Sequence, residues 1–289
     1  MLNLRAGARA FSHWARMLKM RARAASPVDA AEKRRLLVAA RKDTDVLVQA
    51  VRRYGVAVLP GYWPADRCAL ARAEIDRIIA TYPQSVQARS DGADKRMFGV
   101  ESVSDLLMDF HADPFLHRFG ELMGGHDIYN FATLGALIEA TRGNAGSGEG
   151  WHRDAHGFQF KAIIYLSDTS MDNGPFQYLV GSHKLWRAVT DSMVVNVVDP
   201  QQTRFTDDDI AGLAARNIEQ RAFPGKAGTL LLVNTAGIHR GMPLKSAERY
   251  ALTNYYYYKD QIDEGRLVQF DPMVPGTVER ISRDLLAGK

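Results

Sequence analysis

Cysteine is nearly absent from this chain, and long apolar runs are missing. The 289 residues contain one cysteine, Cys68, so an internal disulfide is excluded and a reducing compartment is favoured. No run of about 20 apolar residues is present, which predicts no transmembrane span. The sequence also shows no internal repeat. Its hydrophobic content of 46% is typical of a globular chain, and its length suits one large domain.

Acidic residues are missing from the start of the chain. Residues 1–28 contain six cations and the whole chain has a formal net charge of +4, so residues 29–289 carry about −2 (+4 − 6). The six are Arg5, Arg9, Arg16, Lys19, Arg21 and Arg23. A body without net positive charge lacks the cationic face that nucleic-acid binding requires. We therefore expect no nucleic-acid partner.

The basic N-terminal arm, residues 1–28, also carries apolar residues at roughly helical spacing. These are Leu4, Phe11, Trp14 and Leu18. The pattern is typical of a helix that lies on an anionic membrane. Three interpretations stay open: a disordered tail, contact with an anionic membrane or acidic partner, and an organellar presequence. We expect a cytoplasmic protein, located at a membrane surface if the second interpretation holds.

Two short segments carry candidate metal ligands. In Trp151-His152-Arg153-Asp154, a histidine and an aspartate are two residues apart, so on an extended strand both side chains leave the same face. A second histidine, His239, follows Gly237-Ile238. Two imidazoles and one carboxylate on one face of a metal form the triad of non-haem Fe(II) oxygenases, which leaves positions open for a cosubstrate and O₂. His152, Asp154 and His239 are therefore the predicted metal ligands and catalytic residues.

The spacing of histidine and aspartate is weak evidence by itself. With 8 His and 33 Asp and Glu in 289 residues, about one such pair is expected by chance (8 × 33/289, roughly 0.9). The chain contains a second pair, His111 and Asp113. There, Pro114 follows directly and an apolar periodic segment comes next, which predicts a helix with Asp113 as its N-cap. This second pair is not a predicted metal site.

The surroundings of His152 predict a β-rich fold. Aromatic and apolar segments recur with turn residues between them. The predicted strands are 129–140, 161–166, 176–179, 228–234 and 250–258, and a glycine-rich loop occupies 142–150. Many short strands separated by turn signals indicate an antiparallel barrel or jelly roll. The predicted fold class is mainly β with helical additions.

Several blocks between about Val51 and Tyr258 resemble the phytanoyl-CoA dioxygenase family of Fe(II)/2-oxoglutarate-dependent oxygenases. The blocks are Arg53 to Gly61, Tyr165 to Asp168, Asp172 to Pro175, Gly181 to His183 and Ala227 to Leu232. The resemblance implies a double-stranded β-helix (jelly roll, cupin-like) with helices packed on one side. It also implies that the three ligands named above bind Fe(II), with 2-oxoglutarate as cosubstrate and O₂ as oxidant.

The resemblance further implies that Arg249 binds the distal carboxylate of 2-oxoglutarate. A guanidinium suits this role because its planar fork of donors matches a carboxylate. Arg249 lies ten residues past His239, about one fewer than is usual in the family, so Arg240 and Lys245 stay open as alternative cations. A surface ion pair between Arg249 and Glu248 is a further interpretation.

The chain departs from the family pattern at two positions. Val180 stands where the family usually has proline. Gly241 stands where it often has a hydroxyl residue, two positions past the second iron histidine. Thr253 is the predicted replacement, because it lies four residues from Arg249 on the same strand face and can donate to the same carboxylate. Neither departure affects a predicted metal ligand.

Two further features have open interpretations. His156 is four residues from His152, a spacing that serves metal binding on a helix, but the strand pattern favours a pocket wall or a core position. The aromatic segment 255–258 could stack on a sugar or lipid from alternate positions, although core packing is the more common role of such strands.

Two segments are candidate lids over the barrel. Residues 184–226 form an insertion between the metal-bearing halves, with a predicted helix announced by Thr206 and three aspartates. The glycine-rich loop 142–150 directly precedes the first ligand. The predicted organisation is a basic arm (1–28) followed by a single dioxygenase domain (29–289).

The leading functional hypothesis is an Fe(II)/2-oxoglutarate-dependent dioxygenase. It would hydroxylate a small molecule, lipid or glycan-type substrate and release succinate and CO₂. The same iron chemistry could instead give desaturation or cyclisation, whereas halogenation is disfavoured because Asp154 fills the position that a halide needs. A hypothesis from another class is a non-catalytic cupin-like binding protein. The residues do not identify the substrate, since no CoA-binding signature is visible.

Overall fold

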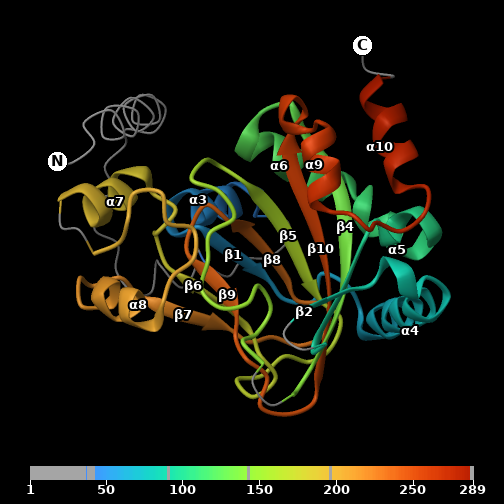
Figure 1. The fold of residues 1–289 in the computed structure, drawn as a ribbon, viewed down its shortest axis with the longest axis horizontal. Helices are drawn as coiled ribbons and strands as arrows, with labels where there is room; N and C mark the ends of the chain where they lie inside the picture. The colour runs from blue at the N-terminus through green and yellow to red at the C-terminus, as the bar shows by residue number, and fades with distance from the viewer. Residues whose placement is uncertain (1–36, 38–42, 90–91, 142–143, 195–196, 287–289) are drawn as a thin grey trace.

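Two antiparallel sheets dominate the computed structural model, which describes residues 37, 43–89, 92–141, 144–194 and 197–286 (Figure 1). The predicted basic arm, 1–28, lies outside these residues. The larger sheet has the order β1-β8-β5-β10-β4-β3-β2 and the smaller has the order β7-β6-β9. The strands are β1 (Val56–Leu59), β2 (Gln87–Arg89), β3 (Asp94–Phe98), β4 (Ile128–Glu139), β5 (Phe160–Tyr165), β6 (Phe176–Leu179), β7 (Gln220–Phe223), β8 (Leu230–Asn234), β9 (His239–Gly241) and β10 (Glu248–Tyr258).

Helices flank the two sheets. They include α3 (Thr44–Tyr54), α4 (Ala65–Thr81), α5 (Asp105–His111), α6 (Pro114–Gly124), α7 (Leu185–Val189), α8 (Asp207–Ala214), α9 (Glu264–Gln269) and α10 (Thr277–Leu286). Four of them begin at side chains that accept hydrogen bonds from their first turn: Ser104, Asp113, Thr206 and Asp263. Within the described part of the chain, none is long and apolar enough to cross a membrane.

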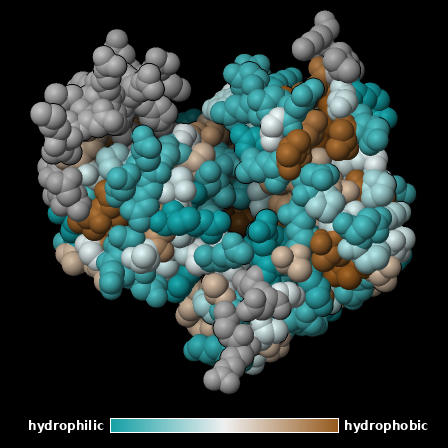
Figure 2. Space-filling view, viewed as in Figure 1, coloured by the Kyte–Doolittle hydropathy of each residue, from teal (hydrophilic) through white to brown (hydrophobic). Residues whose placement is uncertain are grey.

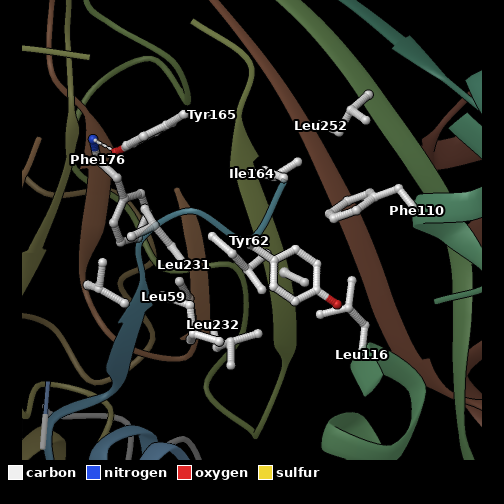
Figure 3. Packing of buried hydrophobic residues seen from close by; sticks show 14 of the residues in the cluster. Leu59, Tyr62, Phe110, Leu116, Ile164, Tyr165, Phe176, Leu231, Leu232 and Leu252 are labelled. Carbon is white, nitrogen blue, oxygen red and sulfur yellow. Dashed lines mark hydrogen bonds between the residues drawn. The ribbon is translucent and has the colours of Figure 1, made fainter. Parts of the chain in front are cut away.

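The main hydrophobic core lies between the large sheet and helices α3 to α6. Figure 3 shows part of this core. Phe110 of α5 and Leu116 of α6 lie in the same part of the view as Leu252 of β10. Tyr165 connects the two sheets. Its hydroxyl accepts from the amide of Phe176 at 2.9 Å (Figure 3) and donates to the carbonyl of Phe223, also at 2.9 Å.

Strand β10 separates this core from a cavity. Its residues Tyr250, Leu252 and Tyr256 belong to the main core, whereas alternate residues of the strand line the cavity. Successive side chains of a strand point to opposite faces, so one strand can build both environments. The cavity side carries Arg249, Ala251, Thr253, Tyr255 and Tyr257.

Most predicted elements are confirmed, with one correction. The five predicted strands correspond to β4, β5, β6, β8 and β10, and the helix predicted after Thr206 is α8. However, the segment with His152 and Asp154 is not a regular strand; His152 forms isolated bridges to Arg204 and His239. Gly146, Gly148 and Gly150 precede it with φ of 83°, 89° and 89°, and such left-handed geometry interrupts a strand.

The insertion 184–226 adds α7, a π-helical turn (Thr190–Val194), α8 and β7 to the small-sheet side. It contacts the predicted ligand segment directly. The amide of Arg153 donates to Thr203, and that of Phe205 donates to Trp151, both at 2.9 Å. Arg204 lines the cavity. The insertion thus forms one wall beside the ligands, and its lid function stays a prediction.

Candidate metal centre

The three predicted ligands converge, although 87 positions separate the first from the last. His152 Nε2 and His239 Nε2 each lie 3.8 Å from an oxygen of Asp154. One ligand atom from each residue falls within 4.8 Å of the others, a grouping that could hold a metal ion. The rings of His152 and His239 are 4.3 Å apart between centroids.

Backbone hydrogen bonds produce this convergence. His152 donates its amide to His239 at 2.9 Å, and His239 donates back at 2.8 Å. The amide of Asp154 donates to Thr235 at 3.0 Å. The ligand segment is therefore fixed against β9 and the loop before it, and both histidines face the carboxylate.

Each imidazole is oriented by its second nitrogen. Nδ1 of His152 lies 2.9 Å from the carbonyl of Gly150, and Nδ1 of His239 lies 2.9 Å from the carbonyl of Gly237. A carbonyl only accepts hydrogen bonds, so Nδ1 carries the proton and the Nε2 lone pair is left for a metal. This donor set fits a divalent iron ion.

The charge state of the ligands also suits metal binding. Burial lowers the pKa of His152 to about 3 and lowers that of His239, so both rings are neutral. Burial by itself would raise the pKa of Asp154, but the ammonium of Lys161 and the two imidazoles hold it below its usual range. Metal ions bind neutral imidazole and ionised carboxylate, so no proton must leave before binding.

The glycine-rich loop is shaped around His152. A Cβ placed on Gly148 would lie 2.1 Å from His152 Cε1, and the φ of Gly148 is +89°. Gly150 has the same φ, but a Cβ there would meet nothing within 4 Å. Position 148 therefore requires glycine because a side chain would collide with His152, whereas position 150 requires glycine only for the backbone turn.

The ligands line a cavity of about 610 Å³ between the two sheets. Figure 2 shows the molecule hollowed near the centre of this face, with mainly hydrophilic residues around the opening. The side chain of Asp154 is 19% exposed, so the carboxylate is reached from the cavity. A cavity of this volume is typical of small-molecule sites.

Arg249 is the buried cation of this cavity. It is 4% exposed, and among the described residues it forms no ion pair and its Nε has no hydrogen-bond partner. Burial lowers its pKa. A buried guanidinium without an anion is costly, so this position calls for an anionic ligand. The surface pair with Glu248 is not formed.

The alternative cations lie elsewhere. Arg240 stacks on Trp151 at 4.4 Å and donates to Gln177, outside the residues that line the cavity. Lys245 is 73% exposed and pairs with Asp172. Arg249 is thus better placed than either for a ligand inside the cavity.

The missing hydroxyl at Gly241 has a structural counterpart. A Cβ on Gly241 would lie 2.8 Å from Arg249 Nη2 and 2.8 Å from the Cβ of Ser147, so Ser147 occupies the space that a side chain there would need. Its hydroxyl accepts from Arg96 at 3.1 Å. Thr253 also faces the cavity, four residues along β10 from Arg249, or about 14 Å at the usual strand rise.

The second His-x-Asp pair has a different environment. Asp113 caps α6 by accepting from the amides of Phe115 and Leu116, as the sequence predicts. His111 contacts the Thr133 hydroxyl at 3.0 Å and lies outside the cavity lining. His156 lines the cavity, which agrees with a wall position.

Lys161, Arg96 and Arg266 are among the polar residues of the cavity that were not predicted from the sequence. The ammonium of Lys161 lies 2.7 Å from Asp154 Oδ2, and its side chain is 7% exposed. A lysine within the apolar strand Phe160–Tyr165 was a readable signal of a buried polar contact. The other two lie on segments that the sequence did not connect with the site.

Comparisons with known proteins agree with this geometry. The phytanoyl-CoA dioxygenase (PhyH) family matches residues 51–251. An ectoine dioxygenase from Stutzerimonas stutzeri (strain A1501) is 26% identical over 153 residues, which cover 48% of this chain and 50% of that protein. The matched region thus spans about half the length of this curated relative.

Solved structures resemble the fold over most of the chain. The epimerase SnoN, in complex with Fe³⁺, alpha ketoglutarate and nogalamycin RO, has 19% identity and a TM-score of 0.59, covering 82% of this chain and 91% of its own. EctD from S. alaskensis in its apoform has 17% identity and a TM-score of 0.60, covering 79% and 81%. At these identities the likeness shows the fold alone. The predicted jelly roll is confirmed.

Proposed function

Because the chain belongs to the phytanoyl-CoA dioxygenase family, a family of Fe(II)/2-oxoglutarate-dependent oxygenases, we propose that it hydroxylates a small molecule with release of succinate and CO₂. One observation carries the proposal. Two neutral imidazoles and a carboxylate meet in the same cavity as a buried guanidinium that lacks an anionic partner. Such a pair of features suits a metal and a dicarboxylate bound together.

In this proposal His152, Asp154 and His239 hold Fe(II) on one face. When bound, Fe(II) and 2-oxoglutarate would activate O₂, the oxidant, whose two atoms would enter the hydroxylated product and succinate. The carbonyls of Gly150 and Gly237 keep both rings in the metal-binding orientation. Lys161 holds the second oxygen of Asp154 and so limits rotation of that carboxylate.

Arg249 binds the distal carboxylate of 2-oxoglutarate in this proposal. Ser147 stands beside it in the space left by Gly241, and it is a closer candidate for the hydroxyl donor than Thr253. Thr253 lines the same cavity but lies about 14 Å along β10 from Arg249, so it is the weaker candidate. Arg96 donates to Ser147 and pairs with Asp94 at 2.6 Å, which fixes the hydroxyl in place.

The insertion 184–226 and the loop 142–150 would exclude water from the reacting centre. The guanidinium of Arg204 donates to the carbonyl of Gly148, so the insertion is joined to the loop beside His152. A contact of this kind can couple closure of the wall to the position of the ligand.

The experiment that tests the proposal is spectroscopic and chemical. Under anaerobic conditions the protein should bind one Fe(II), and 2-oxoglutarate should then produce the weak visible absorption band of a chelated keto acid. Exposure to O₂ should yield succinate. A substrate screen with mass detection then separates hydroxylation (+16) from desaturation or cyclisation (−2). Iron binding without any succinate would instead favour a cupin-like binding protein.

A further inference from the structure

We propose that the end of the cavity remote from Arg249 binds the anionic group of a ring-bearing substrate. The group would be a carboxylate or a phosphate, held by Lys161 and Arg266, which lie over the rings of Tyr255 and Tyr257. This inference extends the proposed function and depends on it only for the claim that the bound molecule is a substrate. The binding claim itself depends only on the residues of the cavity.

The two ends of the cavity are well separated. Lys161 on β5 is paired with Tyr255 on β10, six residues along that strand from Arg249. At the usual rise of about 3.4 Å per residue, this is about 20 Å along the strand. Lys161 also contacts the proposed metal ligand Asp154 at 2.7 Å, so a five-carbon dicarboxylate that extends from Arg249 to the metal would end beside Lys161 and would leave the side toward Arg266 for a second molecule.

The cavity has a surplus of positive charge. Six cationic side chains line it, against the carboxylate of Asp154 in the lining and that of Asp94, which pairs with Arg96 from behind it. They are Arg89, Arg96, Lys161, Arg204, Arg249 and Arg266. The charges of Fe(II) and doubly ionised 2-oxoglutarate cancel, so loading both leaves the surplus unchanged. A neutral or cationic substrate would not compensate this field, whereas an anion would.

Two of these cations face aromatic rings at the remote end. Lys161 Nζ lies 3.9 Å from the ring centroid of Tyr255, and Arg266 Cζ lies 4.4 Å from that of Tyr257. Phe270 packs at 5.8 Å from Tyr255 and at 6.2 Å from Tyr257. Each cation covers one face of its tyrosine, so this end offers positive charge beside aromatic surface, which suits an anionic group attached to an apolar ring.

The hydrogen bonds of these cations leave donors for a ligand. Lys161 has three N–H donors and gives one to Asp154 Oδ2. Arg266 donates to the Gln269 side chain and to the Gln261 carbonyl, and among the described residues no carboxylate pairs with it. Neutral acceptors do not offset the charge of a guanidinium. An anion at this end would therefore gain two charge-assisted partners.

Matched probes test the inference. Phenylacetate, phenyl phosphate and the neutral phenylacetamide share one ring and differ in charge. Each is titrated under anaerobic conditions into protein loaded with Fe(II) and 2-oxoglutarate, and binding is followed by calorimetry and by the ring-proton NMR signals of the probe. We expect both anions to bind at least about tenfold more tightly than the amide. If phenylacetate binds more tightly than phenyl phosphate, the site is specific for a carboxylate; the reverse order indicates a phosphate site.

Variants locate the binding. Arg266→Gln should weaken both anions by about tenfold and leave phenylacetamide unchanged, since the amide makes no charge-assisted contact. Lys161→Met should also weaken the anions. Arg283→Gln is the matched control, because Arg283 is 75% exposed, lies on α10 and pairs with Asp284 outside the cavity. It should behave as the unaltered protein.

The outcomes separate this inference from the proposed function. Equal binding of phenylacetate and phenylacetamide, no binding of the anions at millimolar concentration, or full anion affinity in Arg266→Gln would overturn the inference. If the keto-acid absorption band forms in any of these cases, the oxygenase proposal survives without it. If the band never forms but the anions bind through Arg266, the anion site stands and the oxygenase proposal is lost.

Discussion

Two regions of this molecule contain the same three residue types, yet only one is built to bind ligands. His152 and Asp154 line one cavity with Arg249, while His111, two residues before Asp113, lies 3.3 Å from Arg280. Burial lowers the pKa of both His152 and His111 to about 3. Neither spacing nor pKa distinguishes the regions.

The partners of the polar groups do distinguish them. Arg280 forms an ion pair with Glu101 and donates to the carbonyl of Phe131. Asp113 is occupied by the helix cap and by the Tyr62 hydroxyl at 2.6 Å. Arg249 has no such anion among the described residues. A site for an external ligand is thus recognised by buried polar groups whose charge is not compensated internally.

The largest expected effect comes from removing a ligand imidazole. His239→Ala should abolish Fe(II) binding and turnover, because two remaining ligands bind a labile divalent ion too weakly. Anaerobic Fe(II) titration and succinate release measure both. His111→Ala is the matched control and should keep full iron stoichiometry. Retained activity in His239→Ala would show that the ligand set is wrong.

Arg249→Ala tests the uncompensated guanidinium. Loss of one partner of a desolvated charge pair typically costs about 2 to 5 kcal/mol, so the KM for 2-oxoglutarate should rise by about 30-fold to several thousandfold. Iron affinity should change little. Lys245→Ala, at an exposed cation outside the cavity, should leave the KM unchanged. A wild-type KM in Arg249→Lys would argue against a bidentate contact.

The glycine loop gives a smaller effect. In Gly148→Ala the new Cβ would collide with His152, so we expect Fe(II) affinity to fall by about 10-fold to 100-fold, as when other supports of a ligand are changed. Gly150→Ala has the same φ but open space, so it controls for backbone strain. Equal iron affinity in the two variants would mean that contact with His152 is unimportant.

The smallest effect concerns the second pair. Asp113→Ala should lower the free energy of unfolding by about 1 to 2 kcal/mol, because a helix cap and a hydrogen bond from Tyr62 are lost. Chemical denaturation measures this change. Asp113→Asn, which still caps a helix, should recover most of the loss. An unchanged stability in Asp113→Ala would contradict the capping role.

Much of the fold could be predicted because it depends on local pattern. The apolar and aromatic runs that became β4, β5 and β10 alternate or persist over a full strand, and Thr206 with its aspartates marked α8. The three metal ligands and Arg249 were found through blocks of residues with family spacing. The structure brings all four to one cavity.

The rest depends on contacts between distant segments. Ser147 can replace a hydroxyl at position 241 only because the glycine loop crosses β9, and the amide of Gly241 donates to Ser147 at 2.9 Å. Arg266 reaches Tyr257 because α9 covers the end of β10. Such approaches between distant residues leave no periodicity or spacing in the sequence. The irregular backbone at His152 was missed because glycines upstream, and not the ligand segment, interrupt the strand.

The most direct test of the account compares Asp154→Ala with Asp113→Ala. Each variant is titrated with Fe(II) under anaerobic conditions in the presence of 2-oxoglutarate, and the visible absorption band of the chelated keto acid is recorded. The account predicts one Fe(II) and a full band for Asp113→Ala, and a lost or strongly weakened band for Asp154→Ala. Bands of equal intensity and iron affinity in the two variants would contradict the assignment of the metal centre.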